Sequence, residues 1–130
     1  MKNIDFIMTI HRTEWQINLV DGYDENLLME DGHYHCGITD NFRKKIYINK
    51  DLDKQTFDNV VLHELTHAFI ESYGFLQVKW EDENVADFVA YYSFEIAEKY
   101  DEVIKEIATR GDKIEILEKK TKVRLGKWKI

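Results

Sequence analysis

Residues 60–70, VVLHELTHAFI, place two imidazoles and a carboxylate, together with the hydroxyl of Thr66, inside a pattern that otherwise predicts a buried helix. The imidazoles belong to His63 and His67, and the carboxylate belongs to Glu64. A buried polar group without a partner costs about 1–3 kcal/mol, so the fold must supply partners for them. The apolar residues around them recur at helical spacing, at Phe57, Val60, Val61, Leu65, Ala68 and Phe69.

The residues on either side of this segment delimit the helix. Asp51 or Asp53 can cap its N-terminus, and Gly74 stands where a glycine commonly follows the last helical turn. A second helix is predicted to begin near residues 80–82 and to run through ENVADFVAYYSFEIAEKY. The sequence leaves open whether this helix continues through residues 101–110 or a new helix begins there.

The N-terminal part of the chain predicts strands. Residues 6–19 alternate between apolar and polar side chains, which indicates two strands joined near residues 11–14. Residues 21–35 hold two Asp-Gly pairs and predict a long loop. A second hairpin is predicted to turn near residues 40–44 and to end in the strand Lys45–Asn49. Strands followed by helices indicate an α+β fold, with an N-terminal antiparallel β-sheet packed on the two helices.

Length and composition favour a single cytoplasmic domain. The chain of 130 residues is long enough to bury one core, so we expect one domain over residues 1–130. No apolar run approaches the roughly 20 residues of a membrane span. The first residues lack the long apolar region of a signal peptide, and a single cysteine, Cys36, cannot form an internal disulfide. We therefore expect a cytoplasmic protein without a membrane partner.

Charge is distributed unevenly along the chain. The formal net charge of −7 argues against general nucleic-acid binding, although recruitment to nucleic acid through residues 113–130 stays an alternative. Residues 113–130 nevertheless contain seven Lys or Arg and only two Glu. We interpret this basic C-terminal element as a solvated surface, with a docking arm for an acidic partner as the alternative. Its pattern is ambiguous between a helix and a short hairpin.

The spacing of the polar residues in the first helix is typical of a zinc site. His63 and His67 are four residues apart, so a helix places them one turn apart on the same face. Glu64 is rotated by about 100° from His63. In this H-E-x-x-H pattern the two histidines bind zinc, and the glutamate accepts a proton from the water that the metal activates. The alternative is a pair of hydrogen-bonded core histidines beside a surface glutamate.

A catalytic zinc usually has three protein ligands, so a third must come from elsewhere in the chain. The second helix offers Glu83 and Asp87, which are four residues apart and share a face. Glu83 can bind the ion, while Asp87 can accept a hydrogen bond from the outer N–H of a ligating histidine and so orient it. Asp82 and Asp87 are the alternative third ligands, and an exposed acidic helix start is the non-functional interpretation.

HELTH followed by the ENVAD helix resembles the gluzincin branch of zinc metallopeptidases, and within it the ImmA/IrrE-type peptidases. SprT-like proteases are the runner-up. The likeness covers roughly residues 37–92, and Thr66 stands where the family usually has glycine. KIYIN matches the strand that precedes the H-E-x-x-H helix in that family. The family's E-x-x-A-x-x-φ-A pattern is matched by Glu83, Ala86, Val89 and Ala90.

This resemblance implies a small zincin-like domain that binds one zinc ion. The ligands would be His63, His67 and Glu83, with Glu64 as the general base. The family consists of intracellular enzymes, often associated with phages and mobile elements. By the same analogy, we expect the strand Lys45–Asn49 to be an edge strand on which an extended peptide substrate pairs.

The expected function is therefore zinc-dependent hydrolysis of peptide bonds in an intracellular protein. The alternative is a non-catalytic zincin-like module that docks a protein partner. Tyr91, Tyr92 or His35 can serve as transition-state stabilisers, although the two tyrosines are more simply packing residues. His33, His35 and Cys36 are a second, weaker candidate metal set. The substrate and the oligomeric state are open.

Overall fold

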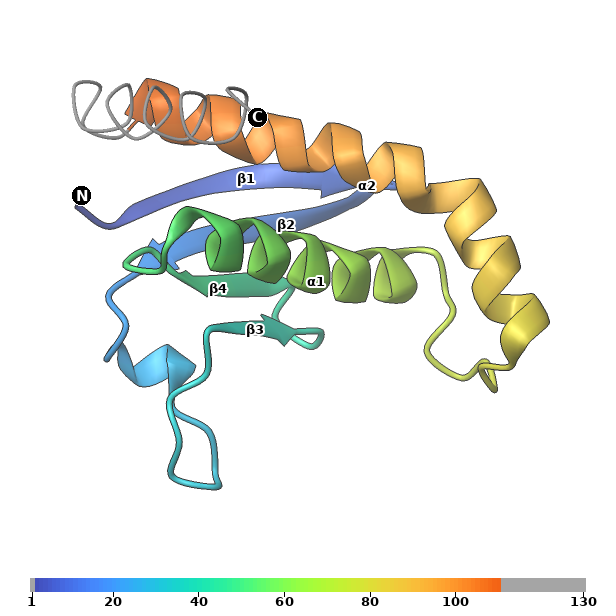
Figure 1. Ribbon diagram of the computed structural model, residues 1–130, viewed down its shortest axis with the longest axis horizontal. Helices are drawn as coiled ribbons and strands as arrows, with labels where there is room; N and C mark the ends of the chain where they lie inside the picture. The colour runs from blue at the N-terminus through green and yellow to red at the C-terminus, as the bar shows by residue number, and fades with distance from the viewer. Residues whose placement is uncertain (1, 111–130) are drawn as a thin grey trace.

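The computed structural model describes residues 2–110, in which four strands and two long helices form an α+β domain (Figure 1). The basic C-terminal element, residues 113–130, lies outside the described residues, and so does the choice between a helix and a hairpin there. The strands are β1 (Ile4–Ile10), β2 (Thr13–Val20), β3 (Gly37–Asp40) and β4 (Lys45–Asn49). They form one sheet in the order β1-β2-β4-β3.

Both predicted hairpins are present in this sheet. β1 and β2 are antiparallel, and the turn between them consists of His11 and Arg12, whose φ angles are 42° and 67°. Two consecutive residues with positive φ match the right-handed twist of the flanking strands. β3 and β4 are also antiparallel, with Thr39 opposite Ile46. The segment between the hairpins contains one short 3-10 helix, η1 (Glu25–Leu27).

The expectation of a purely antiparallel sheet was wrong, because β2 and β4 are parallel. Their register places Ile17 beside Ile46 and Leu19 beside Ile48. The chain leaves β2, passes through residues 21–36 and forms β3 before it turns into β4. In the sheet, β4 lies between β2 and β3 and runs in the same direction as β2. The alternation of apolar residues in Lys45–Asn49 predicts a strand but not which neighbours it has.

Helix α1 (Lys54–Ser72) has the limits that the sequence predicts. Asp53 occupies the N-cap position with extended backbone angles, although its side chain makes no capping hydrogen bond. After Tyr73, Gly74 adopts a φ of 81°, which is the left-handed conformation expected after a helix C-terminus.

Helix α2 (Asp82–Arg110) is one continuous helix, so residues 101–110 continue it without a restart. Its C-terminal half is tied to α1 by a cluster of polar side chains. Tyr100 donates a hydrogen bond of 2.5 Å to Asp58, and Lys54 bonds to both groups. Partial burial and the bond to Asp58 raise the pKa of Tyr100 well above its usual value. Neither helix in residues 2–110 has the length and apolarity that a membrane span requires.

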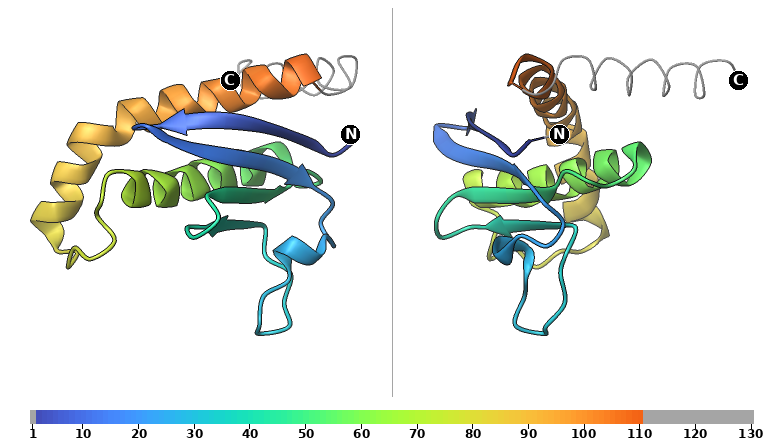
Figure 2. Two further views of the ribbon diagram at one scale, coloured as in Figure 1. Left: turned by 180° about the vertical axis from the view of Figure 1, so that it is seen from behind. Right: turned by 90° about the vertical axis from the view of Figure 1, so that its left-hand side faces the viewer.

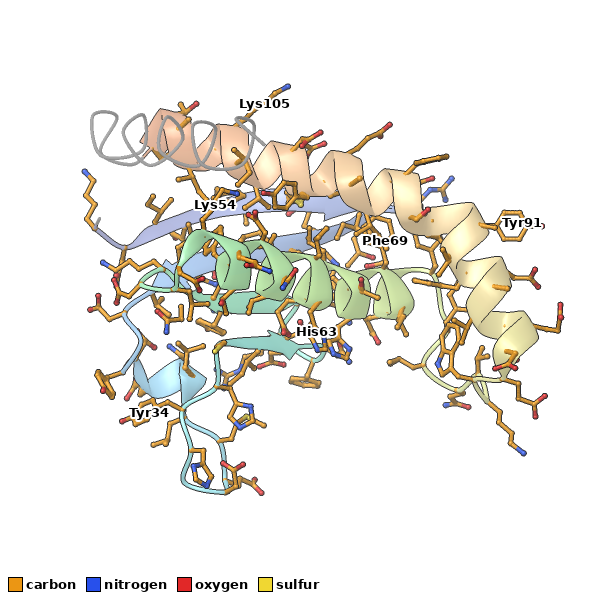
Figure 3. The ribbon with its side chains drawn as sticks, viewed as in Figure 1. Tyr34, Lys54, His63, Phe69, Tyr91 and Lys105 are labelled. Carbon is orange, nitrogen blue, oxygen red and sulfur yellow. The ribbon has the colours of Figure 1, made fainter. Side chains whose placement is uncertain are left out.

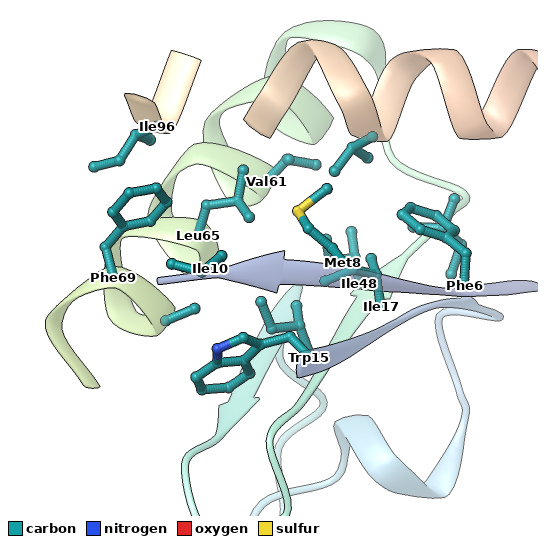
Figure 4. Close-up of a cluster of buried hydrophobic side chains, with 14 of the residues drawn as sticks. Phe6, Met8, Ile10, Trp15, Ile17, Ile48, Val61, Leu65, Phe69 and Ile96 are labelled. Atoms are coloured by element: carbon teal, nitrogen blue, oxygen red, sulfur yellow. The ribbon is translucent and has the colours of Figure 1, made fainter. Parts of the chain in front are cut away.

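The two helices pack on the same face of the sheet (Figures 1 and 2). Side chains of β1 alternate strictly between buried and exposed, as expected when one face of a sheet is covered. The core also includes Trp15 and Ile17 of β2, Ile48 of β4 and Leu65 of α1. Figure 4 shows these side chains meeting between the sheet and the helices. The core thereby fixes which face of α1 is turned away from the sheet.

Candidate metal centre

His63 and His67 lie together on a face of α1 that is turned away from the core. Their Nε2 atoms are 3.2 Å apart, and their ring centroids are 4.8 Å apart. The His63 side chain is 68% exposed, and Figure 3 shows it projecting from α1 near β3. The predicted pairing of the two imidazoles is present, and the pair is open to solvent rather than enclosed in the core.

The spacing of the two nitrogen atoms fits a shared metal ion. A tetrahedral zinc with Zn–N bonds of about 2.0–2.1 Å holds two nitrogen ligands about 3.3 Å apart. The 3.2 Å between the Nε2 atoms of His63 and His67 is close to that value. The same distance also allows one ring nitrogen to donate a hydrogen bond to the other. The geometry thus fits two zinc ligands and equally a metal-free hydrogen-bonded pair.

Glu64 lies beside this pair but is almost fully buried, with a relative exposure of 6%. Its Oε2 atom is 3.9 Å from His63 Nε2. Its Oε1 atom accepts a hydrogen bond of 2.8 Å from the hydroxyl of Thr39. The carboxylate therefore has one oxygen bound by the sheet and the other near the histidines. The surface glutamate of the alternative interpretation is not what the structure shows.

The strand that lies against Glu64 is β3, one of the two edge strands that the sheet has within residues 2–110. Gly37 and Thr39 are two residues apart, so they point to the same side of β3, toward α1. A Cβ atom on Gly37 would lie 2.6 Å from a methyl carbon of Val60 and 2.9 Å from Glu64 Cγ. A side chain at position 37 would therefore force the side chains of Val60 and Glu64 to shift.

This arrangement corrects the expectation for Lys45–Asn49. That strand, β4, is paired on both sides and cannot accept an added strand. Within the described residues, β3 is paired with β4 alone, so its other side is open. The sequence did not indicate Gly37 and Thr39 as site residues, because their contact with Glu64 joins segments about 25 residues apart. No local pattern could have revealed it.

The turn after β3 is also attached to α1. Lys44 Nζ is 2.6 Å from Glu71 Oε1 and donates to the main-chain oxygen of Asn41. Lys44 has a φ of 57°, and its ammonium group lies 5.6 Å from the centre of the Trp15 ring. These contacts hold the β3–β4 hairpin against the second half of α1. Glu71 is therefore engaged by Lys44 and is not part of the histidine pair.

An apolar groove of about 540 Å³ lies on the opposite side of the histidine pair from β3. Leu62, Thr66 and Ile70 form its α1 side, and the first two immediately precede His63 and His67. Successive residues of a helix are rotated by about 100°, so the histidines lie between the β3 edge and the groove. The remaining lining residues come from the segment before α2 and from α2 itself: Trp80, Val85, Phe88, Val89, Ser93 and Ile96.

Glu83, the expected third ligand, lies in the exposed first turn of α2. Asp87 follows one turn later and is also exposed. Among residues 2–110, no three His, Cys, Asp or Glu side chains are grouped so that they can hold a metal ion. The structure therefore brings His63, Glu64 and His67 together but not Glu83, Asp82 or Asp87. Binding by Glu83 would require the start of α2 to lie closer to α1 than it does here.

The other candidate residues occupy different environments. Tyr91 is 73% exposed and points away from α1 (Figure 3). Tyr92 packs in an aromatic cluster, with its ring centre 4.5 Å from that of Tyr73 and 5.2 Å from that of Phe88. Tyr92 thus has the packing role that aromatic residues usually have.

The histidines of the loop before β3 are not assembled into a metal site. His35 Nε2 lies 3.4 Å from Asp31 Oδ2, and the main-chain N–H of His33 donates to Asp31 Oδ1. Cys36 is exposed immediately before β3. These residues are not part of a group of three metal-binding side chains within the described part of the chain.

No family model matches the chain, and no curated protein or solved structure matches it.

The close approach of Gly37 to α1 leads to a stability prediction. Replacing Gly37 by Ala forces a methyl group against Val60 and Glu64, and such overpacking typically costs about 1–3 kcal/mol. We expect urea denaturation to show a loss of unfolding free energy of that size. The added substitution Val60→Ala removes the nearest contact and should restore part of the loss. Equal stability of Gly37→Ala and the wild type would show that β3 does not pack closely on α1.

Proposed function

We propose that this chain is a zinc metallopeptidase of the gluzincin type, resembling the ImmA/IrrE-type peptidases, which hydrolyses peptide bonds in a protein substrate. The observation that carries this proposal is the arrangement of His63, Glu64 and His67 beside an open sheet edge. The two ring nitrogens are 3.2 Å apart, and a buried carboxylate lies 3.9 Å from one of them. A lone exposed cysteine, Cys36, agrees with the cytoplasmic location that we propose.

His63 and His67 would hold the zinc ion, and we propose Glu83 as the third ligand. When bound, zinc polarises a carbonyl group and lowers the pKa of water toward about 7. Glu64 accepts the proton of the attacking water and passes it to the leaving amine, which is the work of a general base that later acts as an acid. An extended substrate pairs with the open side of β3, beside the histidine pair.

A non-catalytic module that docks a protein partner is the second candidate. The absence of a three-ligand group among residues 2–110 favours it, because two histidines alone make a weaker site than a catalytic zinc requires. Such a module would use the same β3 edge for its partner but would not need Glu64.

Removal of the metal separates these two functions. We expect the purified protein to cleave members of a quenched fluorescent peptide library, to lose this activity after treatment with a chelator, and to regain it with added Zn²⁺. Added Mg²⁺ should not restore activity, because imidazole ligands do not suit that ion. Cleavage that persists without metal would rule out zinc catalysis. A zinc-loaded protein that cleaves no peptide would favour the docking module.

A further inference from the structure

Thr39 makes a contact with the carboxylate of Glu64 that joins the sheet to the candidate site. Its hydroxyl lies 2.8 Å from Glu64 Oε1 and 3.3 Å from the main-chain oxygen of the same residue. A threonine hydroxyl has one proton to donate, and the shorter distance identifies the carboxylate as its main acceptor. The contact lies within a partly buried part of the structure, where water competes less for the carboxylate.

The two oxygens of Glu64 therefore have different surroundings. Oε1 is bound by Thr39, while Oε2 is the oxygen that lies 3.9 Å from His63 Nε2. The nearby Gly37 leaves the space that this orientation needs, because a Cβ there would lie 3.1 Å from Oε2. The hydrogen bond from Thr39 to Oε1 therefore restricts rotation of the carboxylate.

We propose that Thr39 is a positioning residue, which holds Glu64 so that Oε2 faces the histidine pair. This inference rests on the proposed function, because it assigns Thr39 a role in presenting the general base. A displacement of about 1 Å in a catalytic group can lower a rate by about 100-fold, so fixing one carboxylate oxygen has a large effect on turnover. Thr39 itself does not touch the reacting atoms.

The variants Thr39→Val and Thr39→Ser separate positioning from packing. Valine keeps the shape and the strand preference of threonine but removes the hydroxyl, whereas serine keeps the hydroxyl. Thr109→Val is the matched control, because Thr109 lies on an exposed part of α2 and, among residues 2–110, its hydroxyl bonds only to the main-chain oxygen of Lys105. All three proteins should bind zinc as the wild type does. Thr39→Ser and Thr109→Val should unfold at the wild-type temperature, whereas Thr39→Val should unfold at a lower temperature, because the buried Glu64 carboxylate loses its hydrogen bond.

The kinetic measurement uses a quenched fluorescent peptide that the wild-type enzyme cleaves, selected from a random library. We expect kcat of Thr39→Val to fall by about 10–100-fold while KM stays nearly unchanged. Thr39→Ser and Thr109→Val should keep kcat close to the wild-type value. A wild-type kcat for Thr39→Val, or an equal loss for Thr39→Ser, would overturn the role of Thr39.

Crystal structures of the metal-free wild type, Thr39→Val and Thr39→Ser give a second readout that does not depend on activity. The Glu64 carboxylate should be rotated or displaced in Thr39→Val and should keep its wild-type place in Thr39→Ser. An unmoved carboxylate in Thr39→Val would overturn the inference whatever the kinetics show. A zinc-loaded wild type that cleaves no library peptide would instead overturn the proposed function, and the role of Thr39 with it.

Discussion

Replacing Glu64 by Gln is expected to leave zinc bound and to lower the rate of peptide cleavage by about 10²–10⁴-fold. The amide has nearly the same shape as the carboxylate and can still accept the hydrogen bond from Thr39, but it cannot accept a proton from water. His63 and His67 keep their places one turn apart on α1, so the metal ligands are unchanged. Zinc content and peptide cleavage should therefore respond differently to this substitution.

The measurement is elemental zinc analysis beside a cleavage assay on the same protein samples. Glu102→Gln is a suitable control, since Glu102 is a half-exposed residue of α2 that pairs only with Lys99 among the contacts described. Its variant should match the wild type in both measurements. A Glu64→Gln protein that cleaves as fast as the wild type would exclude Glu64 as the general base and leave the docking module as the better function.

Replacing either His63 or His67 by Ala should nearly abolish zinc binding. Loss of a group that only supports a metal ligand costs about 10–100-fold in affinity, and loss of a ligand itself costs more. Competition with a colorimetric chelator measures this affinity directly. His33→Ala removes a histidine from outside the pair and should bind zinc as the wild type does. Zinc binding that survives both His63→Ala and His67→Ala would place the metal elsewhere or show it to be adventitious.

The same measurement on Glu83→Ala tests the proposed third ligand. A loss as large as that of His63→Ala would establish that α2 approaches α1 when zinc binds, because Glu83 is not grouped with the histidines in this structure. Asp87→Ala should show the smaller loss expected of a group that orients a ligand. If Glu83→Ala bound zinc with the affinity of the wild type, Glu83 would not be a ligand, and Asp82 or Asp87 would be the candidate in its place.

The parts of the structure that the sequence predicted are those set by local interactions. Helical spacing of apolar residues predicted α1, and Gly74 predicted where it ends. The four-residue interval predicted that His63 lies beside His67. These outcomes depend on residues within a few positions of one another, so a single sequence contains the necessary information.

The parts that the sequence did not predict depend on contacts between distant segments. The alternation in Lys45–Asn49 is the same for an edge strand and a central one, so the central position of β4 could not be deduced from it. The bond from Thr39 to Glu64 likewise follows from strand order and from the packing of β3 on α1. The place of Glu83 depends on how the start of α2 packs against α1, and helical periodicity does not determine that packing.

The shortness of β3 limits how a peptide can be held at the proposed site. β3 has four residues, and in an antiparallel ladder alternate residues direct their main-chain groups to the same side. Two residues of β3 can thus offer at most about four hydrogen bonds to an added strand, each contributing roughly 0.5–1.5 kcal/mol. Association itself costs about 4–15 kcal/mol in lost translation and rotation. Main-chain pairing alone therefore gives almost no net affinity, and a substrate must gain most of its binding free energy from its side chains. Selectivity for particular sequences follows from a strand of this length, whereas a longer edge would retain extended peptides of any sequence.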